Sequence, residues 1–212
     1  MGREIALAYA RRGDRVAMIA RNNATLDPIV RETREAGAPD ASAYTADLTD
    51  QGSVQEVFET IRSTQGEPTI LVYNMATMVK TPPSELKAQE VLETLPAMFF
   101  GAMYCTAEVL PAMRTAGKGT LLYTGGGFGI KPATFTASHS IGKAALRNYV
   151  QNLHQELSPE GILAATVTIT RPVQPGTEYD GGDIARHYVS LHEQVSSRPA
   201  SEWEWEIIHR EL

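Results

Sequence analysis

Two apolar runs with one helical segment between them decide the fold: Gly119-Thr120-Leu121-Leu122-Tyr123-Thr124 and Ile162-Leu163-Ala164-Ala165-Thr166-Val167-Thr168-Ile169. Both runs have the length of a buried strand. Between them, apolar residues recur at helical spacing from about His139 to Leu157, and Pro159-Glu160-Gly161 leads into the second run. A strand, a helix and a second strand in this order predict a parallel pair covered by the helix.

The same alternation continues toward both ends of the chain. Strands are predicted at 16–20, 43–46 and 69–73, and helices at about 5–10, 26–36, 54–61 and 84–113. Residues 170–182 predict a loop, Asp183 an N-cap for a helix that carries Ile184, Tyr188 and Leu191, and residues 203–208 a half-exposed strand. The expected fold class is α/β, a Rossmann-like, doubly wound parallel sheet with helices on both faces. A single domain over residues 1–212 is expected.

The beginning of the chain lacks one expected element. A doubly wound dinucleotide-binding fold starts with a central strand, whose glycine-rich turn opens the first helix. This sequence starts inside that helix, with Gly2 at the position of the last glycine. A strand of roughly half a dozen residues is therefore missing, either by truncation or because another segment fills its slot. Truncation is favoured, because an empty slot leaves two strands without hydrogen-bonding partners.

Composition argues against several classes of function. The 212 residues carry a formal net charge of −6 and scattered Lys and Arg residues, so no nucleic-acid partner is expected. The single cysteine, Cys105, and the lack of paired Cys/His spacing predict neither a disulfide nor a metal site, and favour a cytoplasmic protein. Apolar runs stay far below the ~20 residues of a membrane span, so no membrane segment is predicted. The N-terminus does not read as a signal peptide.

Ordered motifs along residues 2–169 resemble the short-chain dehydrogenase/reductase family. They are Ala10-Arg11-Arg12-Gly13, Asp47-Leu48-Thr49-Asp50, Tyr73-Asn74-Met75-Ala76, Leu110-Pro111, Lys143-Ala144-Ala145-Leu146 and Glu156-Leu157 with Gly161-Ile162. Each motif is weak alone, but their order and spacing indicate this fold. The tail, with Tyr188, Leu191 and Trp203, is similar to an atypical branch that lacks the usual Ser and Tyr. The chain thus resembles an N-terminally truncated member of that branch.

The resemblance implies an NAD(P) cofactor, which would be held by Gly2, Arg21, Asp47, Asn74 and Lys143. Arg21 favours NADP over NAD, because a guanidinium can grip the 2′-phosphate with two charge-assisted bonds. Asp47 would bond the adenine, or else serve as a turn carboxylate. Asn74 would shape the floor under the cofactor, or else satisfy backbone groups at the strand end. Lys143 would bond the nicotinamide ribose, or else be an ordinary helix lysine.

Three of the family's four catalytic positions carry other residues. The Asn, Ser, Tyr and Lys of the family fall on Met98, Gly126, His139 and Lys143. Carbonyl reduction needs a proton donor beside the developing alkoxide, and Gly126 supplies no hydroxyl. His139 is the candidate donor, although nearby Lys143 is expected to hold its imidazole neutral; a histidine without catalytic duty is the alternative. The glycines after Thr124 would offer an anion nest or form only a tight turn.

The resulting hypothesis is an NAD(P)-dependent oxidoreductase that transfers hydride between NADPH and a small carbonyl or alcohol substrate, with a degenerate catalytic tetrad. The alternatives are a non-catalytic NADP-binding regulatory protein and an inactive fragment. A homodimer or homotetramer is expected, because family members pair two long helices. The stripe Leu146, Tyr149, Val150 and Leu153 suits such a contact.

Overall fold

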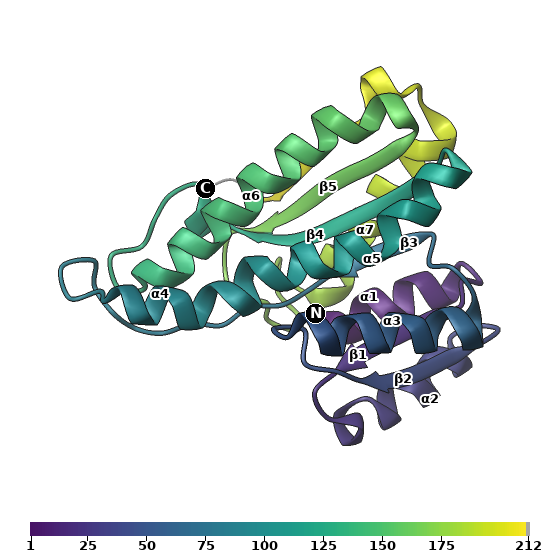
Figure 1. The fold of residues 1–212 in the computed structure, drawn as a ribbon, viewed down its shortest axis with the longest axis horizontal. Coiled ribbons are helices and arrows are strands. Elements are labelled where there is room, and N and C mark those ends of the chain that lie inside the picture. The colour runs from purple at the N-terminus through teal and green to yellow at the C-terminus, as the bar shows by residue number, and fades with distance from the viewer. Residues whose placement is uncertain (211–212) are drawn as a thin grey trace.

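Parallel strands form two sheets in the computed structural model, which describes residues 1–210 (Figure 1). In the smaller sheet, β1 (Val16–Ala20) pairs with β2 (Ala41–Thr45). The larger sheet has the order β3-β4-β5-β6. Its strands are β3 (Ile70–Tyr73), β4 (Gly119–Gly126), β5 (Ile162–Ile169) and β6 (Glu206–His209). Every strand pair is parallel, which confirms the prediction from the alternation of strands and helices.

Helices cover both faces of the larger sheet (Figure 1). The helices α5 (Gly101–Ala116) and α6 (Ala137–Leu157) pack on one face, and α1 (Gly2–Arg11) and α7 (Gly181–Ser197) pack on the other. The helix α3 (Gln51–Gln65) packs beside α5 and lies over the smaller sheet. The helix α2 (Asp27–Glu35) covers the smaller sheet, and α4 (Ala88–Leu95) precedes α5. The α/β class with helices on both faces is therefore confirmed.

The two central strands are buried at nearly every position, on both of their faces. Leu121 of β4 packs into the core under α5 and α6, whereas its neighbour Leu122 packs with α1 and α7. In β5, Ala164 faces the first core and Leu163 the second. All four side chains are fully buried. Since successive side chains of a strand point to opposite faces, this pattern requires a covering layer on each side.

Several predicted boundaries differ from the structure. The strand predicted at 203–208 begins only at Glu206, after a short 3₁₀ turn at Ala200–Glu202. The N-cap prediction for Asp183 is wrong, because α7 begins earlier and Asp180 caps it, accepting a hydrogen bond from the Gly182 N–H at 2.8 Å. The two glycines that suggested a loop form the first turn of the helix.

The helix predicted at 84–113 is divided by a π turn at Pro96–Phe100. Pro96 has no N–H to continue the α-helical ladder, which accounts for the change of helical type there. The whole helical stretch Ala88–Ala116 is long and apolar enough, by length and composition, to cross a membrane. It packs against β3, β4 and α6. The absence of a membrane segment stays a prediction.

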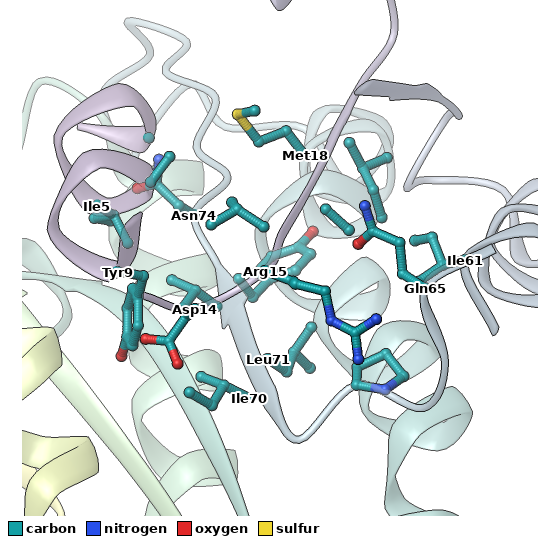
Figure 2. A pocket seen from close by; sticks show the side chains of 18 of the residues that line it. Ile5, Tyr9, Asp14, Arg15, Met18, Ile61, Gln65, Ile70, Leu71 and Asn74 are labelled. Carbon is teal, nitrogen blue, oxygen red and sulfur yellow. The ribbon is translucent and has the colours of Figure 1, made fainter. Parts of the chain in front are cut away.

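A gap separates the two sheets at the place predicted for the missing strand. Among residues 1–210, no strand joins β1 to β3, and a cavity of about 630 Å³ lies between them. Figure 2 shows side chains of α1, β1 and β3, such as Ile5, Met18 and Leu71, around this cavity. In the part of the chain that the structure describes, no strand occupies the position predicted for the first, central strand.

Candidate active site and cofactor site

The residues predicted to hold a cofactor gather at the carboxyl ends of the parallel strands. Arg21 follows β1, Asp47 follows β2 and Asn74 follows β3. Gly2 opens α1 close to Asn74, since a Cβ atom added to Gly2 would lie 3.4 Å from the amide nitrogen of Asn74. Open parallel sheets bind ligands at this edge, where the strand order reverses. Here the strand order reverses between β1 and β3. The structure therefore brings Gly2 and Asn74 together where this type of sheet binds its ligand.

Asn74 is held by a chain of hydrogen bonds that crosses β4 to α7. The hydroxyl of Thr124 donates to Oδ1 of Asn74 at 2.8 Å, and the hydroxyl of buried Tyr188 lies 2.6 Å from Thr124 Oγ1. Because the single hydroxyl proton of Thr124 goes to Asn74, the Tyr188 hydroxyl donates to Thr124. This network fixes the Asn74 amide with its NH₂ group turned toward the start of α1. Helix N-termini favour anions, so an amide donor there suits a phosphate.

Lys143 is buried and directed at backbone carbonyls. Its Nζ donates to the carbonyl oxygen of Thr124 at 2.7 Å and to that of Met75 at 3.3 Å, and only 3% of the residue is exposed. Burial lowers the pKa of its ammonium to about 8. The lysine thus ties the carboxyl ends of β3 and β4 together, and one N–H of the ammonium is left for a ligand.

His139 lies one helical turn before Lys143, near the start of α6, and is almost fully buried. Its Nδ1 is 2.7 Å from the carbonyl oxygen of Thr77, which can only accept, so Nδ1 carries the proton. Burial lowers the pKa of His139, and the charge of Lys143 adds to this effect, while the Thr77 carbonyl opposes it. The neutral ring therefore presents Nε2 as a proton acceptor, a base rather than an acid at neutral pH.

The positions that the resemblance assigns to Asn and Ser are closed by packing. Met98 is fully buried in the π turn, and its sulfur accepts the N–H of Thr77 at 3.1 Å. Gly142 gives Met98 its space, because a Cβ there would lie 2.7 Å from the Met98 Cβ. A Cβ on Gly126 would lie 3.3 Å from Cγ of Lys143. Met98 and Gly126 therefore belong to the packing around Lys143 and supply no hydroxyl or amide.

The glycine run after Thr124 continues strand β4 before the chain turns at Gly127. Strand β4 continues to Gly126, which pairs with Ile169 of β5. A Cβ atom on Gly125 would lie 2.6 Å from Oγ1 of Thr168, so only glycine allows this close approach of the strands. The first two glycines thus belong to the sheet ladder, and Gly127 begins the 3₁₀ turn Gly127–Gly129, while the anion nest stays a prediction.

Arg21 and Asp47 follow β1 and β2, at the carboxyl ends of the strands where the candidate cofactor residues gather. Asp47 Oδ1 accepts from the N–H of Thr49 at 2.9 Å and from its hydroxyl at 2.7 Å, which is the turn role predicted as the alternative to adenine binding. These bonds lower the pKa of Asp47, and the nearby charge of Arg21 lowers it further. Both residues are exposed, so both remain accessible to a ligand.

The roles of Thr124 and of the Tyr188 hydroxyl were not predicted from the sequence. Tyr188 was expected only as a stripe residue of its helix. A buried tyrosine hydroxyl normally has a hydrogen-bond partner, and this was the one available signal. The pair formed by His187 and His209, with 2.9 Å between Nε2 and Nδ1, was also missed. Among residues 1–210, no group of three or more His, Cys, Asp or Glu residues could hold a metal ion.

The apolar stripe of α6 faces the core of its own chain. Leu146, Val150 and Leu153 are buried in the cluster that includes β4 and α5, and Tyr149 packs against it. The predicted contribution of this stripe to a subunit contact is therefore wrong. The oligomeric state itself stays a prediction.

Comparison with known proteins identifies the relatives of this chain. The family profile described as short chain dehydrogenase matches residues 1–177. The 11-beta-hydroxysteroid dehydrogenase A of Sesamum indicum is 24% identical over 202 residues, which cover 94% of this chain and 58% of that protein. The very-long-chain 3-oxoacyl-CoA reductase of Anas platyrhynchos is 26% identical over 173 residues, 79% of this chain and 54% of that protein. The chain thus spans little more than half the length of these curated relatives.

Solved structures show the same fold. A short-chain dehydrogenase/reductase from Burkholderia xenovorans superimposes with a TM-score of 0.87 at 20% identity, covering 98% of this chain and 87% of the other. A metagenomic short-chain oxidoreductase in complex with NADP gives a TM-score of 0.82 at 20% identity, covering 98% and 90%. Because the family profile matches residues 1–177, which is most of this chain, the chain belongs to the short chain dehydrogenase family.

Proposed function

We propose that this chain is an NADP(H)-dependent oxidoreductase that interconverts a small alcohol and its carbonyl compound, with His139 as the proton-exchanging residue. The observation that supports this role is the hydrogen bond from His139 Nδ1 to the Thr77 carbonyl, one helical turn from Lys143. It fixes the tautomer and leaves Nε2 to exchange a proton. The family relationship supports the reaction class.

The residues at the strand ends fit a nicotinamide cofactor in charge and hydrogen-bonding capacity. The start of α1 and the Asn74 amide offer donors for phosphate, and exposed Arg21 offers a guanidinium for a 2′-phosphate. Lys143 keeps one N–H for a ribose hydroxyl. NADP is favoured over NAD by Arg21. It is also the ligand named for the metagenomic relative, and a relative in Schizosaccharomyces pombe is named an NADPH-dependent 1-acyldihydroxyacetone phosphate reductase.

The protonation state of His139 favours alcohol oxidation at neutral pH. A bound nicotinamide cofactor supplies the hydride acceptor or donor. Neutral His139 takes the hydroxyl proton of the alcohol at Nε2, whereas carbonyl reduction needs the imidazolium to return that proton. Since the pKa of His139 lies below its ordinary value of 6.5, the imidazolium is scarce at pH 7. Reduction is thus expected to strengthen as the pH falls below 6.5, and oxidation as it rises.

A second function, a non-catalytic NADP-binding regulatory protein, is favoured by one observation. Two of the three Lys143 donor positions are used by backbone carbonyls, and Met98 and Gly126 supply no catalytic group. The scaffold would then bind cofactor without redox chemistry. This alternative keeps Arg21 and Asn74 as binding residues.

Replacing His139 with phenylalanine distinguishes the two functions. A matched control is His154→Phe, because the Nδ1 of His154 also bonds to a backbone carbonyl and burial lowers its pKa as well. NADPH binding is followed by fluorescence titration, and turnover with a panel of alcohols and carbonyl compounds. Turnover lost only in His139→Phe, with binding kept, supports the enzyme. Binding without turnover in the unmodified chain supports the regulator, and turnover that survives in His139→Phe refutes the role of His139.

A further inference from the structure

A pair of histidines joins helix α7 to the end of the last strand, β6. Nε2 of His187 lies 2.9 Å from Nδ1 of His209, and the centroids of the two rings are 5.1 Å apart. His209 is buried, and His187 is partly buried. Two imidazole nitrogens at this distance share one proton, because an N–H must face a lone pair. No step of the proposed reaction uses this pair.

The loop 170–180 determines which nitrogen carries the shared proton. Nε2 of His209 is 2.8 Å from the carbonyl oxygen of Glu178, which can only accept, so this nitrogen carries a proton. In the neutral pair, Nδ1 of His209 is therefore the acceptor, and Nε2 of His187 is the donor. The two rings thus connect the loop to α7 through the Glu178 carbonyl.

Further contacts fasten the same loop around His209. The rings of Tyr179 and His209 meet edge to face, with 5.1 Å between their centroids. The hydroxyls of Tyr179 and Thr170 are 2.7 Å apart, and that of Thr170 donates to the His209 carbonyl oxygen at 3.1 Å. The loop follows Ile169, which pairs with Gly126 at the carboxyl end of the sheet. A displacement of His209 therefore reaches the edge where the candidate cofactor residues gather.

One added proton leaves the contact between the rings in place, whereas a second proton breaks it. With one extra proton, one ring is an imidazolium and the other keeps a lone pair, so an N–H still faces an acceptor. With two extra protons, an N–H of each ring points at the other ring. Two positive charges then also lie about one hydrogen-bond length apart in a largely buried place, where their repulsion is strong.

The charged groups around His187 do not compensate for this repulsion. Burial lowers the pKa of His187, and His209 lowers it further. The positive charges of Arg186 and Arg210 act in the same direction. Asp183 opposes them, but its carboxylate is already bound to Arg186 at 2.6 Å. The doubly charged pair therefore has no free anion to hold it together.

We propose that His187 and His209 form a proton-operated clamp on the loop 170–180, which stays closed with one extra proton and opens with two. His187 belongs to α7, whose neighbouring residues Ile184 and Tyr188 are fully buried in the core. His209 lies at the end of β6, so the repulsion displaces His209 more readily than His187. The contacts of His209 with the loop are lost with it, and acid thereby releases the loop.

Hydrogen exchange in the unmodified chain, without cofactor, tests the clamp independently of any enzymatic activity. The amides of Gln174, Thr177 and Asp180 report on the loop, because each donates to a backbone carbonyl within it. Exchange is compared at about pH 7.5 and about pH 5, after correction for the intrinsic chemical rate, on either side of the ordinary pKa of histidine. Protection of these amides should fall by roughly tenfold or more in acid, while the amides of β5 keep theirs.

Two variants separate the clamp from a general effect of acid. His187→Gln should keep the loop protected at both pH values, because an uncharged amide can donate to His209 or accept from it. The matched control is His192→Gln. Nδ1 of His192 is 2.9 Å from the Thr120 hydroxyl, at the amino end of β4, and burial lowers its pKa as well, so this variant should open in acid like the native chain.

Three results would overturn the proposal. The first is a native loop that is equally protected at both pH values. The second is an acid response that His187→Gln leaves unchanged. The third is a response that His192→Gln suppresses to the same extent as His187→Gln.

Discussion

Replacing Lys143 with methionine should remove a rise in stability that the native chain shows above pH 8. Lysine has an ordinary pKa of 10.5, and burial lowers that of Lys143 to about 8. Between these values the folded chain has lost the Lys143 proton and the unfolded chain still holds it. Because the unfolded state then binds more protons, the free energy of unfolding rises with pH in this window.

The magnitude follows from the width of the window. One pH unit of differential titration is worth about 1.4 kcal/mol. From pH 8 to about pH 9.5 the gain is about 1.5 kcal/mol, since titration in the folded state is only half complete at the lower limit. Higher pH is unsuitable, because burial raises the pKa of Tyr9, Tyr123 and Tyr188, and ionisation of tyrosines in the unfolded chain then lowers stability.

Urea unfolding of the native chain and of Lys143→Met at several pH values in this window measures the difference. Burial also raises the pKa of Cys105 to about 12. Above pH 9 this lowers the free energy of unfolding, by the same amount in both proteins. The control is Lys118→Met, because Lys118 is exposed, and its pH dependence should follow that of the native chain. If Lys143→Met shows the same pH dependence as the native chain, Lys143 is not held between the two carbonyls as a buried ammonium.

Three further outcomes are expected. Tyr188→Phe removes the hydroxyl that donates to Thr124, so the free energy of unfolding should fall by about 1 kcal/mol. The affinity for NADPH should fall as well. Unchanged affinity in a fluorescence titration would show that the orientation of Asn74 does not depend on this network. Gly142→Ala places a Cβ 2.7 Å from that of Met98, and a loss of about 1–3 kcal/mol in urea unfolding is expected from overpacking; a neutral result would contradict the packing at Met98. Burial lowers the pKa of His187, so the unfolded chain binds this proton more readily and stability should fall below pH 6.5. His187→Gln should weaken this fall in thermal unfolding. An unchanged pH profile of the midpoint would contradict the prediction.

The sequence was sufficient for the fold where periodicity and burial agree. The runs at 16–20 and 162–169 are strands with the predicted bounds. In the second run, apolar side chains at successive positions suit a strand that is buried on both faces. Prediction failed where the same stretch of sequence is compatible with two local structures. Asp180 and Asp183 are both good N-caps, and only the tertiary placement of α7 selects the first. The glycines after Thr124 suggest a turn, but Gly125 and Gly126 pair with β5, where a Cβ at position 125 would meet the Thr168 hydroxyl.

The candidate site was predicted in its positions but not in its contacts. The motif spacing places Lys143 and His139 on one face of α6 and Asn74 at a strand end, and the structure has them there. A motif does not specify where a flexible side chain points. The four-carbon stem of Lys143 turns its ammonium toward the Thr124 carbonyl, over the space that a side chain at position 126 would enter. Such a contact depends on residues far apart in sequence, and no single segment encodes it.

The residues at the four positions that the resemblance assigns to the catalytic tetrad fit one another physically. Met98 is accommodated because Gly142, on the facing helix, has no Cβ. The stem of Lys143 lies against Gly126, and His139 and Met98 bond the same residue, through the carbonyl and the N–H of Thr77. Side chains that did not fit one another would leave voids or unpaired polar groups, whereas these residues fill space and share partners. Met98, Gly126, His139 and Lys143 therefore form one packed arrangement, and of these four residues Lys143 and His139 carry a titratable group.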